Sequence, residues 1–172
     1  MLLETATINP VVHIASHFRF IPGTEKDSFL LLGNGNHLGL DQVKNSSYFQ
    51  KSELLTLSAC ETAMGSRGQG TEIEGFGALA MGQGAKAVIA TLWQVADEST
   101  ALLMQEFYRL KEEKKLVKVE ALRQAQLGLL NGTIKPRTQP DEQSDDGETD
   151  DTDKPYAHPY YWAPFILMGN WK

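Results

Sequence analysis

Short apolar runs separated by longer mixed stretches make up most of the chain. Five of these runs have the length and the β-branched or aromatic content of strands. They cover residues 11–16, 29–32, 54–59, 87–93 and 164–168. The first run is apolar without alternation, as in a strand that is covered on both faces. The second is followed by Gly33-Asn-Gly-Asn36, which predicts a turn.

Between these runs, apolar residues recur at helical spacing in three stretches. They are residues 73–83, 98–111 and 117–130. Gly75 and Gly77 would let the first helix pack closely against its neighbours. Asp97 is placed to cap the second helix, and Gly132 follows the end of the third. Strands that alternate with helices predict an α/β fold with a mostly parallel sheet.

Charge is distributed unevenly along the 172 residues, whose net charge is −6. Residues 131–155 contain eight acidic and three basic side chains, so this stretch alone carries −5. Such a stretch cannot bury apolar surface. We therefore expect a disordered acidic insert at residues 133–154 within one domain that spans residues 1–172.

Several functional classes are disfavoured by composition. No apolar stretch approaches the roughly 20 residues that cross a bilayer, and no secretion signal is visible at the N-terminus. Basic residues do not gather with aromatic ones, so nucleic-acid binding is not expected. A single cysteine cannot form an internal disulfide, which favours a reducing, cytoplasmic setting. No metal or other cofactor is expected.

Two predicted strands end in side chains that can do chemistry together. His17 follows the run at residues 11–16, and Cys60 follows the run at residues 54–59. In a parallel α/β sheet, sites form beyond the carboxyl ends of the strands. A thiol with a pKa of about 8.5 needs a neighbouring base to become a nucleophile, and an imidazole can serve as that base. The backbone N–H groups of Phe18 and Cys60 are candidates for binding an oxyanion.

Each of these residues also has a plainer interpretation. A lone cysteine at a strand end is often a small buried apolar side chain. His13 and His17 are four residues apart, but on a strand they would stand ~13 Å apart, too far to share a metal ion. Flanked by Val12 and Ile14, His13 is better explained as a hydrogen-bonded core histidine.

The motifs of the chain resemble those of the CHAT domain family, a caspase-like peptidase module that is often found behind tetratricopeptide repeats in bacteria. They occur in the family's order over almost the whole chain outside the acidic insert. The final Asn170-Trp171 is similar to cyanobacterial members. The matching motifs are His13-Ile-Ala-Ser-His17, Leu57-Ser-Ala-Cys-Glu-Thr-Ala-Met-Gly65, Glu74-Gly-Phe-Gly77, Gly84-Ala-Lys-Ala-Val88, Thr91-Leu-Trp-Gln-Val-Ala-Asp97, Phe107-Tyr108, Glu120-Ala-Leu-Arg-Gln-Ala-Gln126 and His158-Pro-Tyr-Tyr-Trp-Ala-Pro-Phe165.

This resemblance implies a three-layer α/β caspase-like sandwich and a clan of cysteine endopeptidases that includes caspases and separase. It implies that His17 is the general base and Cys60 the nucleophile that cleaves a protein or peptide substrate. The segment that ends in Asp97 resembles the separase segment whose aspartate lines the S1 pocket. Asp97 is therefore expected to select a basic P1 residue, or to act only as a helix cap.

Two features depart from the family pattern. The family usually has glycine after the catalytic histidine, whereas this chain has Phe18, which would put a bulky ring beside the site. Family domains also begin further upstream, so N-terminal strands are expected to be missing. A tetratricopeptide-repeat segment or an upstream half on another chain is therefore an expected partner. The alternative function is a catalytically inactive CHAT remnant that acts as an interaction or regulatory module.

Overall fold

The computed structural model describes residues 10–19, 21, 24, 27–58, 76–93, 95–136 and 154–172. The chain forms two compact units. The first contains residues 1–94 and 165–171, and the second contains residues 95–164 and 172. Within the described ranges, none of the helices has the length and apolar character that a membrane span requires.

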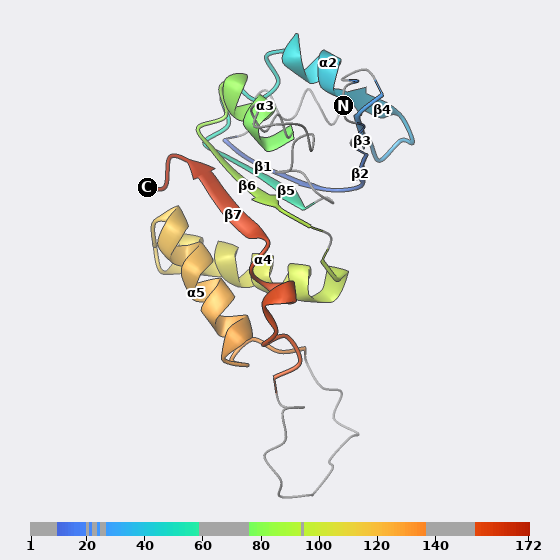
Figure 1. The fold of residues 1–172 in the computed structure, drawn as a ribbon. Helices are drawn as coiled ribbons and strands as arrows, with labels where there is room; N and C mark the ends of the chain where they lie inside the picture. The colour runs from blue at the N-terminus through green and yellow to red at the C-terminus, as the bar shows by residue number, and fades with distance from the viewer. Residues whose placement is uncertain are drawn as a thin grey trace, which may run out of the picture. The chain divides into compact units, whose positions relative to one another are not determined.

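A four-stranded sheet forms the centre of the first unit (Figure 1). Its strands are β1 (Val11–Ala15), β5 (Leu54–Ser58), β6 (Ala87–Thr91) and β7 (Phe165–Gly169), in the order β1-β5-β6-β7. β1, β5 and β6 are parallel, and β7 runs antiparallel to β6. The predicted α/β fold with a mostly parallel sheet is therefore confirmed, and it is consistent with a caspase-like α/β sandwich.

A second, smaller sheet is antiparallel and was only partly predicted. It contains β2 (Phe18–Arg19), β3 (Phe29–Leu31) and β4 (His37–Gly39). β3 matches the predicted run, whereas β2 and β4 are too short to produce a pattern. The expected turn joins β3 to β4, and Gly35 takes a φ of +81° in it, a conformation that favours glycine.

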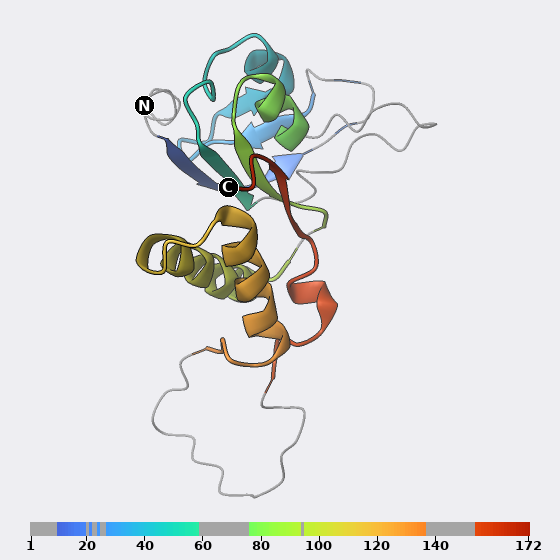
Figure 2. The same ribbon diagram turned by 90° about the vertical axis from the view of Figure 1, so that its left-hand side faces the viewer.

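Two short helices complete the first unit, α2 (Leu40–Lys44) and α3 (Phe76–Gly82). They lie side by side in Figure 2. The helix predicted at residues 73–83 is confirmed over α3; Gly75 lies outside the described residues. A Cβ at Gly77 would stand 2.5 Å from Met168 Cε, whereas Val88 Cγ1 and Ala90 Cβ would lie at ordinary contact distances of 3.5 and 3.6 Å. The glycine therefore leaves room for the Met168 side chain where α3 packs on the sheet.

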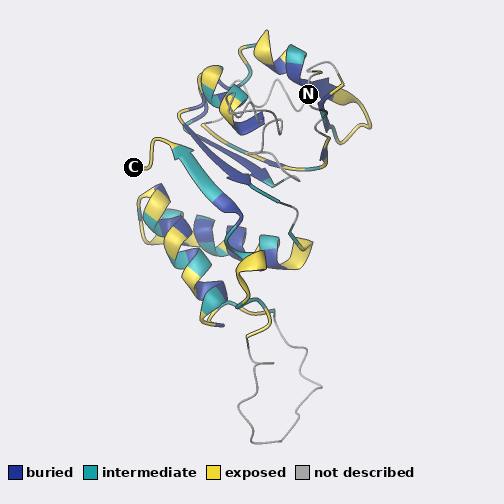
Figure 3. Cartoon of the chain, in the orientation of Figure 1, coloured by how far each residue is buried: buried dark blue, intermediate teal, exposed yellow. Residues whose placement is uncertain are grey.

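Burial differs sharply between the strands of the four-stranded sheet (Figure 3). β6 is buried at all five positions and β5 at four, whereas β1 is fully buried only at Ile14. The expectation that residues 11–16 are covered on both faces is therefore wrong for β1. Among the described strands β1 stands at the end of the sheet, and its alternate residues Val11, His13 and Ala15 are exposed.

The second unit contains two long helices that pack against each other, α4 (Asp97–Glu113) and α5 (Lys118–Leu130), followed by a short 3-10 helix, η2 (Pro159–Tyr161). Both long helices match their predicted stretches, and Gly132 has the positive φ expected after α5. The predicted cap is wrong, because Ala96 is the N-cap of α4 and Asp97 is the first helical residue. Within the expected insert, residues 137–153 lie outside the described residues, so its disorder stays a prediction.

Candidate functional site

His17 lies in the short connection between β1 and β2. Its backbone carbonyl accepts a hydrogen bond from Leu31 N at 2.9 Å. The preceding Ser16 hydroxyl donates to the carbonyl of the same Leu31 at 2.5 Å. These two bonds fix the chain at His17 to β3, while the His17 residue itself is exposed. The connection therefore holds the backbone and leaves the imidazole accessible.

The sequence predicts that the Phe18 ring stands beside the site, and this prediction is wrong. The ring is buried, with 7% of the residue exposed, and meets Phe76 edge-on with centroids 5.6 Å apart. Successive side chains on an extended chain point to opposite sides, so the exposed His17 and the buried Phe18 face in opposite directions. The bulky side chain thus joins the core of the first unit instead of crowding the imidazole.

The pairing of β1 with β5 relates the positions in the sequence of His17, which follows β1, and Cys60, which follows β5. Every pair in this parallel ladder, from Val11↔Leu54 to Ala15↔Ser58, is offset by 43 residues. His17 follows Ala15 by two positions, and Cys60 follows Ser58 by two positions. Cys60 lies outside the described residues, as does the stretch at residues 59–75 that contains it. Its catalytic role stays a prediction, and so does the oxyanion role of the Phe18 and Cys60 backbone.

A side-chain hydrogen bond joins the same two strands. His13 Nε2 and Ser58 Oγ are 2.9 Å apart. Partial burial of the ring against its neighbours lowers the pKa of His13 below its usual value of 6.5, which favours the neutral imidazole. The predicted hydrogen bond of His13 is confirmed, but its place in the core is wrong because the residue lies on the exposed side of β1. Ser58, the last residue of β5, was missed by the sequence analysis.

Asp97 belongs to a different unit from His17. It begins α4, is exposed, and adds negative charge to the first turn, where the helix dipole favours it. Its neighbour Glu98 accepts a hydrogen bond from the Tyr156 hydroxyl at 2.7 Å. Together, burial and this contact raise the pKa of Tyr156 to about 12. The role of Asp97 in substrate selection stays a prediction.

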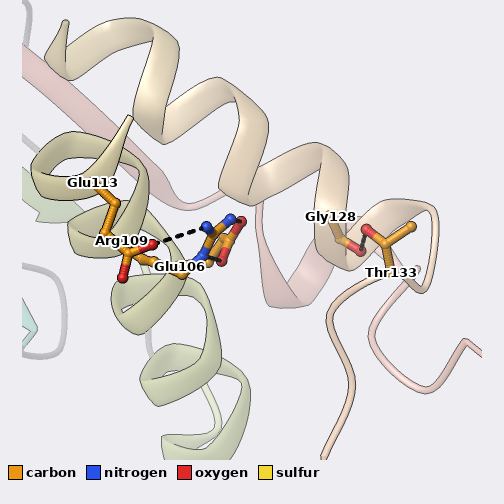
Figure 4. Close-up of polar contacts among 5 residues, drawn as sticks. All are labelled: Glu106, Arg109, Glu113, Gly128 and Thr133. Carbon is orange, nitrogen blue, oxygen red and sulfur yellow. Dashed lines mark hydrogen bonds and ion pairs between the residues drawn. The ribbon is translucent and has the colours of Figure 1, made fainter. Parts of the chain in front are cut away.

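An open pocket of about 710 Å³ is lined by residues of α4, α5 and the segments that follow them. On one side, Arg109 binds Glu106 through two 2.7 Å contacts and approaches Glu113 at 3.4 Å (Figure 4). The hydrogen bonds to Glu106 raise the pKa of Arg109. On the other side, the Thr133 hydroxyl donates to the Gly128 carbonyl. Cysteine and histidine are absent from its lining, so this pocket does not provide the nucleophile and base of a peptidase.

In the part of the chain that the structure describes, three or more histidine, cysteine, aspartate or glutamate side chains do not gather in a way that could hold a metal ion.

An α/β fold with a mostly parallel sheet, with His17 just beyond one strand and Cys60 two residues beyond the next, is the arrangement of the caspase-like cysteine peptidases. The sequence model described as CHAT domain matches residues 2–170. The chain therefore belongs to the CHAT domain family, which is a caspase-like peptidase family. Among curated proteins, none gives a significant sequence match.

Proposed function

We propose that this protein is a cysteine endopeptidase in which Cys60 is the nucleophile and His17 the general base. The observation that carries the proposal is the β1–β5 register. The two parallel strands end at a matched pair, Ala15 and Ser58, and His17 and Cys60 each follow that pair by two positions in the sequence. Because the carboxyl ends of parallel strands meet at one edge of a sheet, we expect the imidazole and the thiol to meet there.

The proposed reaction has two steps. His17 takes the proton of the Cys60 thiol, the sulfur bonds to the scissile carbonyl carbon, and the carbonyl oxygen becomes an oxyanion held by the backbone N–H groups of Phe18 and Cys60. Collapse of this intermediate breaks the C–N bond, and the imidazolium returns the proton to the leaving amine. Water, deprotonated by His17, then hydrolyses the thioester and frees Cys60.

Covalent labelling tests this proposal. We expect a peptidyl acyloxymethyl ketone with arginine at P1 to modify Cys60 of the folded protein at pH 7, as located by peptide mass spectrometry. Any thiol reacts slowly with electrophiles, so two reference rates are needed. The first is labelling of the same protein unfolded in guanidinium, and the second is labelling of the folded protein by iodoacetamide. Cys60→Ala serves as the control without a thiol. Labelling no faster than in the unfolded chain would favour the non-catalytic interaction module.

Substrate selection by Asp97 is a second part of the proposal. A carboxylate that pairs with the cation of a P1 arginine in a partly desolvated pocket contributes about 2 kcal/mol or more, which is about 30-fold in rate. Asp97→Asn should therefore slow labelling by the arginine electrophile about 30-fold and leave labelling by a norleucine analogue nearly unchanged.

The neighbouring Glu98 offers a matched control for Asp97. Glu98→Gln removes the same charge from the same helical turn, and both variants lose a similar interaction with the helix dipole. Only Asp97→Asn should change the ratio of the two labelling rates. An equal loss with both electrophiles would leave Asp97 with no role beyond the helix terminus.

A further inference from the structure

We propose that His13 and Ser58 are positioning residues that hold the ends of β1 and β5 in the register on which the dyad depends. This inference rests on the function proposed above. Their hydrogen bond, 2.9 Å between His13 Nε2 and Ser58 Oγ, joins the two strands four residues before His17 and two residues before Cys60. It is formed by side chains, so it adds to the backbone ladder of the parallel pair.

The hydrogen bond between His13 and Ser58 is diagonal to the strands, and this orientation determines which motion it resists. In the ladder, His13 pairs with Thr56 and Ser58 pairs with Ala15, so the bond runs diagonally across two residue pairs. A diagonal tie resists sliding of one strand along the other, whereas a bond between direct partners resists mainly their separation. The small Ala15 side chain leaves room for the His13 ring to reach forward to Ser58.

The imidazole of His13 and the hydroxyl of Ser58 are also chemically suited to this hydrogen bond. A neutral imidazole has one nitrogen that donates and one that accepts, and a hydroxyl can do either, so the pair can bond in both ring tautomers. Partial burial lowers the pKa of the His13 ring, which favours this neutral form. His13 and Ser58 lie on one face of the β1–β5 pair, since Ser58 is the ladder partner of Ala15 and alternate residues of a strand share a face.

Such positioning matters because reaction rates depend steeply on geometry. A displacement of about 1 Å between reacting groups can cost up to about 100-fold in rate. A tie placed four residues before His17 and two residues before Cys60 limits the motion that would separate these two residues along the strands. The positioning residues would then affect the chemical step and leave substrate binding unchanged.

Ser58→Ala tests the inference through the kinetics of Cys60 labelling by the arginine electrophile. We expect the first-order inactivation constant to fall about 10-fold, while the concentration for half-maximal inactivation stays within about 2-fold. Ser58→Thr keeps the hydroxyl and should restore the rate. His13→Phe combined with Ser58→Ala should lose no more rate than His13→Phe alone, since the bond to Ser58 is already absent from the single variant.

Ser46→Ala is the matched control. The Ser46 hydroxyl donates to the Val43 carbonyl at 2.8 Å and accepts from Tyr48 N at 3.4 Å, so its loss removes side-chain hydrogen bonds in the same unit without touching β1 or β5. The control should label at the parental rate even if its melting temperature falls as much as that of Ser58→Ala. A lowered melting temperature in Ser58→Ala with a parental inactivation constant would reduce the pair to a structural contact and overturn the inference.

The remaining outcomes separate the inference from the function on which it rests. If the parent labels rapidly at Cys60 and Ser58→Ala labels equally fast, the inference fails and the peptidase proposal stands. If the folded parent labels no faster than the unfolded chain, both fail. Modification of Ser58 in place of Cys60 would make the serine a nucleophile and would also overturn its positioning role.

Discussion

Replacing His17 with alanine is expected to slow the labelling of Cys60 by a peptidyl electrophile about 10²- to 10⁴-fold at pH 7, the range that a positioned general base contributes. The imidazole is exposed and its backbone is fixed to β3 by the bond from Leu31, so removing the ring should leave the local fold intact. The measurement is the second-order labelling rate, with the thermal unfolding curve as a check on the fold.

His37→Ala is the matched control for this variant. His37 is also exposed, and its ring stacks on Phe29 with centroids 3.6 Å apart in the β3–β4 hairpin. It lies on the small antiparallel sheet and not at the end of β1. We expect its labelling rate to match that of the parent. Equal rates for His17→Ala and His37→Ala would mean that His17 does not activate the thiol, and the dyad would be wrong.

The strand pattern could be predicted because burial on both faces leaves a continuous apolar run. β5 and β6 show this most clearly, since nine of their ten residues are buried. The same reasoning failed for β1, whose apolar residues Val11 and Ala15 are exposed. A run of apolar residues shows which side chains of a strand could be buried. The position of the strand in the sheet determines which of them are buried.

The pattern of apolar and polar residues does not predict the direction of a strand. β7 has an apolar run like those of β5 and β6, but it runs antiparallel to β6. Side-chain alternation is the same in both directions, so only the path of the preceding chain sets the direction. For the same reason the two-residue strand β2 and the three-residue strand β4 left no signal, because they depend on pairing with β3 and not on their own periodicity.

The sequence predicts which residues form the candidate site, but it does not predict the contacts that support them. The positions of His17 and Cys60 after two apolar runs were enough to suggest a dyad. The orientation of Phe18 required the tertiary structure, because glycine is usual at this position of the family and only the contact with Phe76 shows where the ring goes. The His13–Ser58 bond required the β1–β5 register, which no single run of residues specifies.

Phe76→Ala is expected to be among the most destabilising single substitutions, at about 3–5 kcal/mol, because it removes a large side chain from a site that cannot collapse easily. Phe76 is fully buried, and its ring meets Phe18 at 5.6 Å and Phe49 at 6.1 Å, edge-on in both cases. For a chain of this size the loss corresponds to a fall of roughly 6–20 °C in melting temperature. Phe29→Ala, which truncates a half-buried ring on the small sheet, should cost much less.

This substitution also connects the core to the proposed site. Phe18 follows His17 directly, so the ring that would lose its partner belongs to the residue next to the proposed base. We therefore expect Phe76→Ala to slow Cys60 labelling at 15 °C, where most of the protein is still folded, by more than Phe29→Ala does. Phe76→Leu fills most of the space and should recover both stability and rate. If Phe76→Ala lowers the melting temperature but labels at the parental rate, the packing of Phe18 stabilises the fold without orienting His17.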